Sequence, residues 1–401
     1  METLALSLNH LPSDLRNCFL YLGGFPEDYR FHVARLIWLW IAEGFIQEFE
    51  NQSLEETAKD YLMELVDRNH VVVQDRKFDR AIKTFSVHDV LRELSSEIAT
   101  KERFNIEVLR WGNRIIAPYK TSRLFICPTT EYFYESYIVL KCSRSWRLLT
   151  VLDLRECHLN YFPEEISLLV NIRYLAIQND FREFPSTICI LRSLQTLIIE
   201  GWISDGPLVL PNTISNLVNL RHLQCRRAIV FPPLQMPFEN LQTISSVVLG
   251  HEPTSWVNYF PGVKKLSCSV YGDRKYDLKS LTFLEILKIT GMKSKVIPRF
   301  KKKSMIRFPA SLTKLTLKGC HLPWSHMSYI QSLPNLEVLK LLTDAFVRPQ
   351  WDAGEEPFQQ LKFLKLSCLD IQEWEASSIN FQCLKQLVLY CCFSLERIPQ
   401  T

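Results

Sequence analysis

The residues best suited to chemistry in this sequence are His88 and Asp89, at the expected start of a helix that runs from about residue 88 to residue 99. The first backbone N–H groups of a helix lack partners within it, and the helix dipole favours an anion there. An imidazole N–H at this place can donate a hydrogen bond to a phosphate, and Asp89 can cap the helix or orient the imidazole. Spacing alone favours a purely structural role for the pair.

Other catalytic and metal-binding patterns are lacking in the sequence. The string G-x-x-x-x-G-K-S/T, whose backbone and lysine cradle phosphates, does not occur, so we expect no ATP hydrolysis and only weak ADP affinity. No Ser-His-Asp or paired-carboxylate arrangement is recognisable. The twelve cysteines form no C-x-x-C motif, and Cys320, His321 and His326 lack a fourth metal ligand. We therefore predict neither an enzyme nor a metal site.

Three helices and a β-ribbon should position His88. Ser13 is expected to cap the first helix. The second runs from about residue 31 to residue 42, with Gly44 as its C-cap. Apolar residues surround this second helix almost completely, so it should be buried. The third helix begins with a capping box made by Ser53 and Glu56. Two short strands, over residues 71–73 and 81–87, complete a winged-helix pattern.

A winged helix either reads DNA or acts as a scaffold. A DNA reader needs basic residues on its third helix. Here the exposed positions of that helix are mainly acidic, and a net negative charge would repel phosphates. We therefore expect no nucleic-acid binding. These acidic positions are Glu55, Glu56, Asp60, Glu64 and Asp67, against the two basic residues Lys59 and Arg68.

The rest of the chain is an array of about eleven irregular leucine-rich repeats. The first apolar residue of an L-x-L core recurs at intervals of 21 to 28 residues. A single repeat cannot bury its apolar face, so stacking makes one continuous core. Cys157, Cys320 and Cys392 occupy a position that should turn inward. The repeat leucines are Leu152, Leu175, Leu197, Leu223, Ile244, Leu266, Leu287, Leu315, Leu339, Leu364 and Leu387.

The outward strand positions of the repeats should line a concave, partly basic surface that suits protein partners. The residues predicted to bind a partner there are Asp153, Arg155, Gln178, Arg226, Lys288, Lys314, Lys318, Lys340, Lys365 and Tyr390.

Charge is distributed unevenly along the chain. The first 110 residues hold 13 basic and 19 acidic residues, whereas the remaining 291 hold 34 and 24. Residues 286–336 contain no acidic residue and ten basic ones, including Lys301, Lys302 and Lys303. These three lysines form either a solvated loop or a contact with an acidic partner: the front domain, a pathogen protein or an acidic membrane surface.

No apolar run is long enough to cross a bilayer, and no basic segment precedes an apolar one at the start. These features favour a cytoplasmic protein, with peripheral membrane association as the alternative.

Three phrases carry a family resemblance: CFLYLGGFPED (Cys18–Asp28), LIWLWIAEGFI (Leu36–Ile46) and VHD (Val87–Asp89). In this order they resemble the last subdomain of plant NB-ARC leucine-rich-repeat disease-resistance proteins. The family has Met where this chain has Val87. The repeats are most similar to the coiled-coil subgroup that includes late blight resistance protein homologs.

The resemblance implies an immune receptor in which ADP/ATP exchange is coupled to a hypersensitive response. It implies that His88 contacts the terminal ADP phosphate and that the winged helix contacts the repeats. The expected partner is a pathogen effector or a guarded host protein. The alternative is a protein-interaction module that binds no nucleotide and acts as a decoy or regulator of full-length family members.

The predicted fold is therefore α/β, with a winged-helix subdomain followed by a leucine-rich-repeat solenoid. Residues 1–105 form the winged helix, residues 106–147 a linker or N-terminal cap, and residues 148–401 the repeats. Because the phosphate-binding string and a polar capping repeat are missing, we expect a truncated member of the family.

Overall fold

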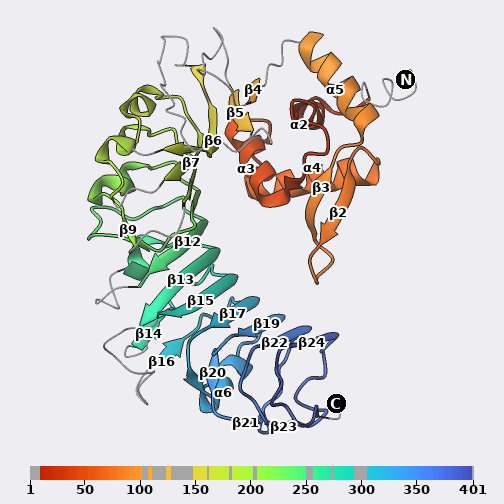
Figure 1. The fold of residues 1–401 in the computed structure, drawn as a ribbon, viewed down its shortest axis with the longest axis vertical. Helices are drawn as coiled ribbons and strands as arrows, with labels where there is room; N and C mark the ends of the chain where they lie inside the picture. Colours follow the sequence, from red (N-terminus) through yellow and green to blue (C-terminus); the bar gives the residue numbers. More distant parts are fainter. Residues whose placement is uncertain are drawn as a thin grey trace. The chain divides into compact units, whose positions relative to one another are not determined.

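A computed structural model describes residues 10–101, 107–110, 123–127, 148–159, 162–179, 183–201, 206–249, 256–271, 275–292 and 305–399. The chain divides into two compact units (Figure 1). Unit 1 comprises Met1–Phe181 and Thr187–Trp202, and unit 2 comprises Arg182–Ser186 and Ile203–Thr401.

The first part of unit 1 has the predicted winged-helix architecture. A three-stranded antiparallel sheet in the order β1-β3-β2 accompanies the helices. The helices are α2 (Ser13–Leu22), α3 (Val33–Glu43), α4 (Leu54–Asp67) and α5 (Asp89–Lys101). The strands are β1 (Phe31–His32), β2 (Val72–Arg76) and β3 (Ile82–Ser86). Strand β1 lies where the sequence led us to expect the start of the second helix.

Local signals set several of the helix ends. Ser53 and Glu56 form the predicted capping box at the start of α4. Gly44 ends α3 with a φ of 76°, a left-handed conformation that favours glycine. The prediction for Ser13 was wrong: Pro12 is the N-cap of α2, and Ser13 is the first helical residue. Proline cannot donate a backbone hydrogen bond, and the start of a helix does not need one.

The second glycine-dependent position of the winged helix is Gly23, which follows α2. A Cβ atom there would lie 2.4 Å from Ser95 Oγ and 2.8 Å from the backbone nitrogen of Ser96, both on α5. Ser95 is fully buried. Helices α2 and α5 can therefore approach this closely only because Gly23 has no side chain.

Parallel strands follow the winged helix in unit 1. Two of them, within the range expected to hold a linker or cap, add to the edge of the repeat sheet. The order of strands is β8-β7-β6-β5-β4. They are β4 (Glu107–Arg110), β5 (Arg123–Cys127), β6 (Val151–Leu159), β7 (Tyr174–Asn179) and β8 (Thr196–Glu200).

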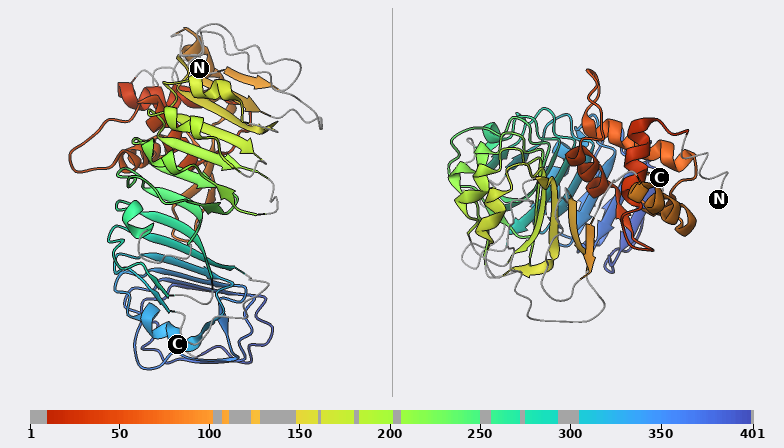
Figure 2. Two further views of the ribbon diagram at one scale, coloured as in Figure 1. Left: turned by 90° about the vertical axis from the view of Figure 1, so that its left-hand side faces the viewer. Right: turned by 90° about the horizontal axis from the view of Figure 1, so that it is seen from above.

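Unit 2 continues the repeat pattern with a parallel sheet whose strands lie side by side (Figure 2). Its main strands are β10 (His222–Cys225), β12 (Thr243–Val248), β13 (Lys265–Tyr271), β15 (Ile286–Met292), β17 (Lys314–Lys318), β19 (Val338–Leu342), β22 (Phe363–Ser367) and β24 (Gln386–Tyr390).

The predicted leucine ladder is confirmed, because all eleven repeat positions lie in strands. In unit 2 they are in register from Leu223 to Leu387, and in unit 1 from Leu152 to Leu197. Each ladder residue except Leu387 is almost fully buried. In-register stacking of these leucines, with isoleucine at position 244, gives the array its continuous core.

Short elements return the chain between the main strands. Two 3-10 turns, η2 (Glu164–Leu168) and η4 (Asn212–Asn216), bury Ile166 and Ile214 completely. The other short strands and helices of unit 2 are β9 (Leu208–Val209), β11 (Ile229–Val230), η5 (Trp256–Tyr259), β14 (Lys275–Asp277), β16 (Met305–Arg307), β18 (Leu322–Pro323), η6 (Trp324–His326), α6 (Met327–Gln331), β20 (Phe346–Val347), β21 (Gln350–Asp352) and β23 (Glu373–Glu375). A further 3-10 turn, η3, spans Ser186–Ile190.

Three tryptophans form a stack in the return segments of unit 2. The ring centroids of Trp324 and Trp351 lie 4.8 Å apart at 7°, and those of Trp351 and Trp374 lie 4.8 Å apart at 6°. All three side chains are buried. The stack repeats one aromatic contact from rung to rung, as the leucine ladder does in the sheet.

The cysteine prediction is confirmed where the structure tests it most directly. Cys320 is fully buried, and burial raises the pKa of its thiol to about 12, so it is a neutral packing residue. Cys392 is half-buried. The side chain of Cys157 lies outside the described residues.

Candidate functional site

His88 lies directly before α5, and its side chain is exposed. Its backbone oxygen accepts a hydrogen bond from Arg92 N at 2.9 Å, which closes the first turn of the helix. Asp89, also exposed, is the first helical residue, where a carboxylate interacts favourably with the dipole. The imidazole is therefore accessible beside the N-terminus of α5, but its role in phosphate binding stays a prediction.

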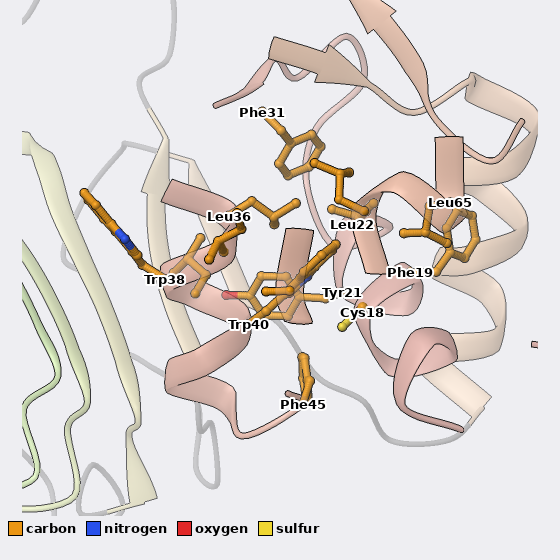
Figure 3. Close-up of a cluster of buried hydrophobic side chains, with 14 of the residues drawn as sticks. Cys18, Phe19, Tyr21, Leu22, Phe31, Leu36, Trp38, Trp40, Phe45 and Leu65 are labelled. Atoms are coloured by element: carbon orange, nitrogen blue, oxygen red, sulfur yellow. The ribbon is translucent and has the colours of Figure 1, made fainter. Parts of the chain in front are cut away.

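A second region of interest is the contact between α3 and the first repeats. Helix α3 contacts β6 and β7. The buried residues Val151, Tyr174, Ala176 and Ile198 of the strands belong to the same apolar cluster as α3. Figure 3 shows Trp38 on the side of α3 that faces the strands, while Trp40 points into the winged helix. The apolar residues that surround α3 thus join the winged helix and the first repeat strands in one apolar cluster.

Charged side chains of alternating sign lie at this contact. Arg155 Nη2 lies 2.6 Å from Asp153 Oδ2, and Arg155 Nε donates to Asp153 Oδ1 at 2.8 Å. Arg155 Nη1 lies 3.6 Å from Glu200 Oε1. The same glutamate oxygen accepts a hydrogen bond from Arg35 Nη2 of α3 at 3.1 Å. We call Arg35, Asp153, Arg155 and Glu200 the ion-pair cluster.

The Asp153 and Arg155 side chains of this cluster are almost buried, so the charge of each depends strongly on the other. Burial acts to lower the pKa of Arg155, but the charge and hydrogen bonds of Asp153 outweigh it and raise the pKa. Arg155 therefore remains charged. The pKa of the neighbouring Tyr174 is raised by burial and by Asp153. The Tyr174 hydroxyl, which is inaccessible, has no hydrogen-bond partner among the described residues.

A further contact ties the end of α3 to β7. Arg173 Nη1, from the residue preceding β7, donates to the backbone oxygen of Ala42 at 3.5 Å. The last carbonyl groups of a helix lack partners within the helix and carry negative partial charge. A guanidinium is therefore well suited to this position.

The predicted intramolecular contact between the winged helix and the repeats is thus present within unit 1. It also changes the interpretation of two predicted partner-binding residues. Asp153 is only 3% exposed, and the Arg155 side chain 10%. Both side chains form ion pairs within unit 1, where α3 covers the sheet at their position. Gln178, the next predicted residue, is half-buried.

The sheet of unit 2 has a different face. Alternation along its strands buries the leucines and turns lysines outward. Six lysines from β13 to β22 occupy such outward positions, and we call this surface the lysine face: Lys265, Lys288, Lys314, Lys318, Lys340 and Lys365. Five of the six are predicted partner-binding residues.

Two lysines of this face lie against aromatic rings of the next strand. Lys340 Nζ is 5.6 Å from the ring centroid of Phe363, and Lys365 Nζ is 5.9 Å from that of Tyr390. The structure thus brings Tyr390 next to the predicted lysines. Arg226, by contrast, is exposed in the turn after β10. Lys301, Lys302 and Lys303 lie outside the described residues.

Sequence reasoning missed Arg35 and Lys265. Arg35 is the one charged side chain in the first half of α3. A helix that is apolar on nearly all sides must be buried by other elements on more than one side. That pattern was the available signal for a second contact surface. Lys265 precedes the leucine of its repeat in the same way as Lys314 does, so register alone identifies it.

Two classes of site are lacking in the part of the chain that the structure describes. No group of three or more His, Cys, Asp or Glu residues there could hold a metal ion. No described helix has the length and apolar character needed to cross a membrane.

Two known families match this sequence. Residues 25–95 match the family described as "Disease resistance protein Winged helix domain". Residues 132–396 match the family described as "Leucine-rich repeat region". The second match alone covers more than half of the chain.

Similar proteins are found in Solanum demissum. The late blight resistance protein R1-A is 31% identical over 448 residues, which cover 98% of this chain and 34% of that protein. A putative late blight resistance protein homolog of the same species is 31% identical over 452 residues, with 98% and 33% covered. The chain spans about a third of the length of these relatives. A solved leucine-rich-repeat protein of Leptospira interrogans is 16% identical over 64% of this chain and 80% of its own, with a TM-score of 0.33, which is too low to support an argument.

Proposed function

We propose that this chain, which belongs to the plant leucine-rich-repeat disease-resistance proteins, supplies the winged helix and the sensor of an intracellular immune receptor. In this proposal the repeats recognise a pathogen effector or a guarded host protein in the cytoplasm. Recognition is coupled to ADP/ATP exchange and leads to the hypersensitive response. The similarity to late blight resistance proteins over nearly the whole chain motivates the proposal.

The contact in unit 1 is the observation that carries it. A receptor must transmit a change at its sensor to its switch, and an element that contacts both parts provides a direct route for this coupling. Helix α3 is such an element, because Trp40 is buried within the winged helix while Arg35 is paired with Glu200 of the repeats. A change in either part therefore alters the environment of α3.

We further propose that His88 donates to the terminal phosphate of ADP and that Asp89 helps to hold the imidazole or the helix start. This would stabilise the ADP-bound, inactive receptor. The exposed position of His88 before α5 supports the proposal, since a phosphate can reach both the imidazole and the first N–H groups of the helix. The remaining phosphate contacts would come from a loop of the G-x-x-x-x-G-K-S/T type.

The first test is to map the transcript upstream of Met1. An in-frame G-x-x-x-x-G-K-S/T segment supports the receptor. A transcript that starts at Met1, with no upstream frame, supports the alternative of a decoy or regulator that binds no nucleotide.

The second test uses the longer protein that such mapping provides, expressed in leaves. His88→Ala should release ADP faster during purification and should cause cell death without a pathogen. The matched control is His10→Ala, which changes another exposed histidine of the same subdomain. Unchanged ADP retention together with no cell death would remove His88 from the proposed site.

A further inference from the structure

The lysine face consists of rows that run across the strands of unit 2. The register places Lys288, Thr316, Lys340 and Lys365 in one row. Adjacent strands are about 4.8 Å apart, so the three strand steps from Lys288 to Lys365 span about 14 Å. A fully extended peptide covers this distance with about four to five residues.

This face is electropositive because the strands contribute only basic charges. None of the six main strand sequences from β13 to β24 contains Asp or Glu. The nearest acidic residues in the sequence are Glu285 and Glu337, each directly before a strand. Glu337 is already paired, because Lys362 Nζ lies 2.6 Å from its Oε1 atom. The face thus favours an anionic ligand.

Apolar side chains are interleaved with the lysines. Ile286 and Leu342 are half-buried at outward positions, and the ring of Phe363 lies beneath Lys340. A ligand that offers only phosphates would leave these groups unmatched.

We propose that the lysine face binds an acidic polypeptide segment that also carries apolar or aromatic side chains and that runs across the strands. This rests on the proposed receptor function, for which it specifies the chemistry of the recognised partner. Carboxylates pair with the lysine rows, and the apolar side chains pack between them. Polyphosphates and nucleic acids are the competing class of ligand.

The test is a binding measurement on the purified 401-residue chain. Fluorescence anisotropy compares three labelled probes: a random copolymer of glutamate and tyrosine, polyglutamate of equal length, and inorganic polyphosphate. The copolymer should bind most tightly, and its affinity should fall as NaCl rises from about 0.05 to about 0.5 M, because salt screens exposed charges. Tighter binding of polyphosphate than of the copolymer overturns the proposal.

A matched pair of variants locates the binding surface. Lys288→Glu with Lys365→Glu should weaken copolymer binding roughly tenfold or more. Lys275→Glu with Lys279→Glu makes the same change in net charge on and after β14, which belongs to a separate small sheet, and should weaken it less than about twofold. Equal losses in both variants would show that net charge alone is responsible and would overturn the proposal.

Two controls separate a loss of binding from a loss of folding and from a failure of the proposed receptor function. Thermal unfolding of each variant must match that of the parent. If the glutamate variant unfolds, Lys288→Gln with Lys365→Gln replaces it, with an expected loss of about threefold. Since binding is measured without a plant cell, a failed defence assay with copolymer binding intact overturns the receptor function alone.

Discussion

The sheets of the two units are built on the same leucine ladder but use their outward positions in opposite ways. In unit 1 the outward positions of β6 to β8 carry apolar residues and the ion-pair cluster, and α3 covers them. In unit 2 the corresponding positions carry lysines and hydroxyl groups interleaved with apolar side chains such as Ile286 and Leu342. The repeat scaffold therefore fixes where an outward side chain lies, whereas the residue type determines whether that position joins an apolar cluster or forms a charged face.

The comparison is most strongly tested by Trp38→Ala. Because Trp38 is 8% exposed and belongs to the cluster shared by α3 and the strands, its loss should destabilise unit 1 by about 3–5 kcal/mol. Hydrogen exchange should show lost protection in α3 and β7 and unchanged protection in β17. Phe283→Ala, at a 61% exposed position of unit 2, is the control and should have little effect. Equal losses in both strands would contradict separate roles for the two sheets.

Asp153→Ala should have the next largest effect. It leaves the Arg155 guanidinium enclosed without its main partner, and breaking a buried pair in this way costs about 3 kcal/mol or more. Chemical denaturation monitored by exchange in β6 and β7 measures the loss. Lys288→Ala, on the open face, should change stability by less than about 0.5 kcal/mol. A cost for Asp153→Ala below about 1 kcal/mol would mean that the cluster is solvated.

The pair formed by Arg35 and Glu200 should contribute less. Their side chains are 22% and 31% exposed, so solvent weakens their attraction. A double-mutant cycle with Arg35→Gln and Glu200→Gln should give a coupling free energy of about 0.5–1 kcal/mol. A coupling of zero would leave the apolar cluster and the hydrogen bond from Arg173 to Ala42 as the described links between α3 and the repeats.

Salt should act in opposite directions on the two units. Screening weakens the attraction within the ion-pair cluster but relieves repulsion among the lysines. Between about 0.02 and about 0.5 M NaCl, exchange protection should rise by a few tenths of a kcal/mol in β17 and fall slightly in β7. The Lys288→Gln with Lys365→Gln variant should lose part of the rise in β17. A rise of equal size in both strands would point to a general salt effect.

The smallest expected effect is a pH dependence from His70. This residue is 3% exposed with its ring 5.3 Å from that of Phe19, and burial, together with Arg68, lowers its pKa. The unfolded chain therefore takes up a proton near pH 6.5 that the folded chain resists, and unit 1 should lose stability as the pH falls below this value. His70→Gln should reduce the slope of stability against pH between about 7.5 and about 5.5, whereas His10→Gln should leave it unchanged.

Repeat architecture was predictable because each rung repeats one local rule. The leucine positions, the capping box at Ser53 and the turn at Gly44 depend on patterns within a few residues. Asp153 and Arg155 show where such reasoning ends. Their outward position was evident from the L-x-L pattern, but the helix that covers them is more than 100 residues away in sequence. The family resemblance implied that the winged helix contacts the repeats, and the nearly complete apolar surface of α3 was the local sign that this helix makes the contact.

The three stacked tryptophans of unit 2 affect how the number of repeats in this chain can change. Each indole stacks on the indole of the next rung, so duplicating or deleting one whole repeat, such as the one that carries Trp351, would leave neighbouring tryptophans to stack in the same way. The lysine rows would meanwhile lengthen or shorten by about 4.8 Å, one strand spacing. The chain could thus gain or lose one rung of recognition surface at a time while its core stays filled.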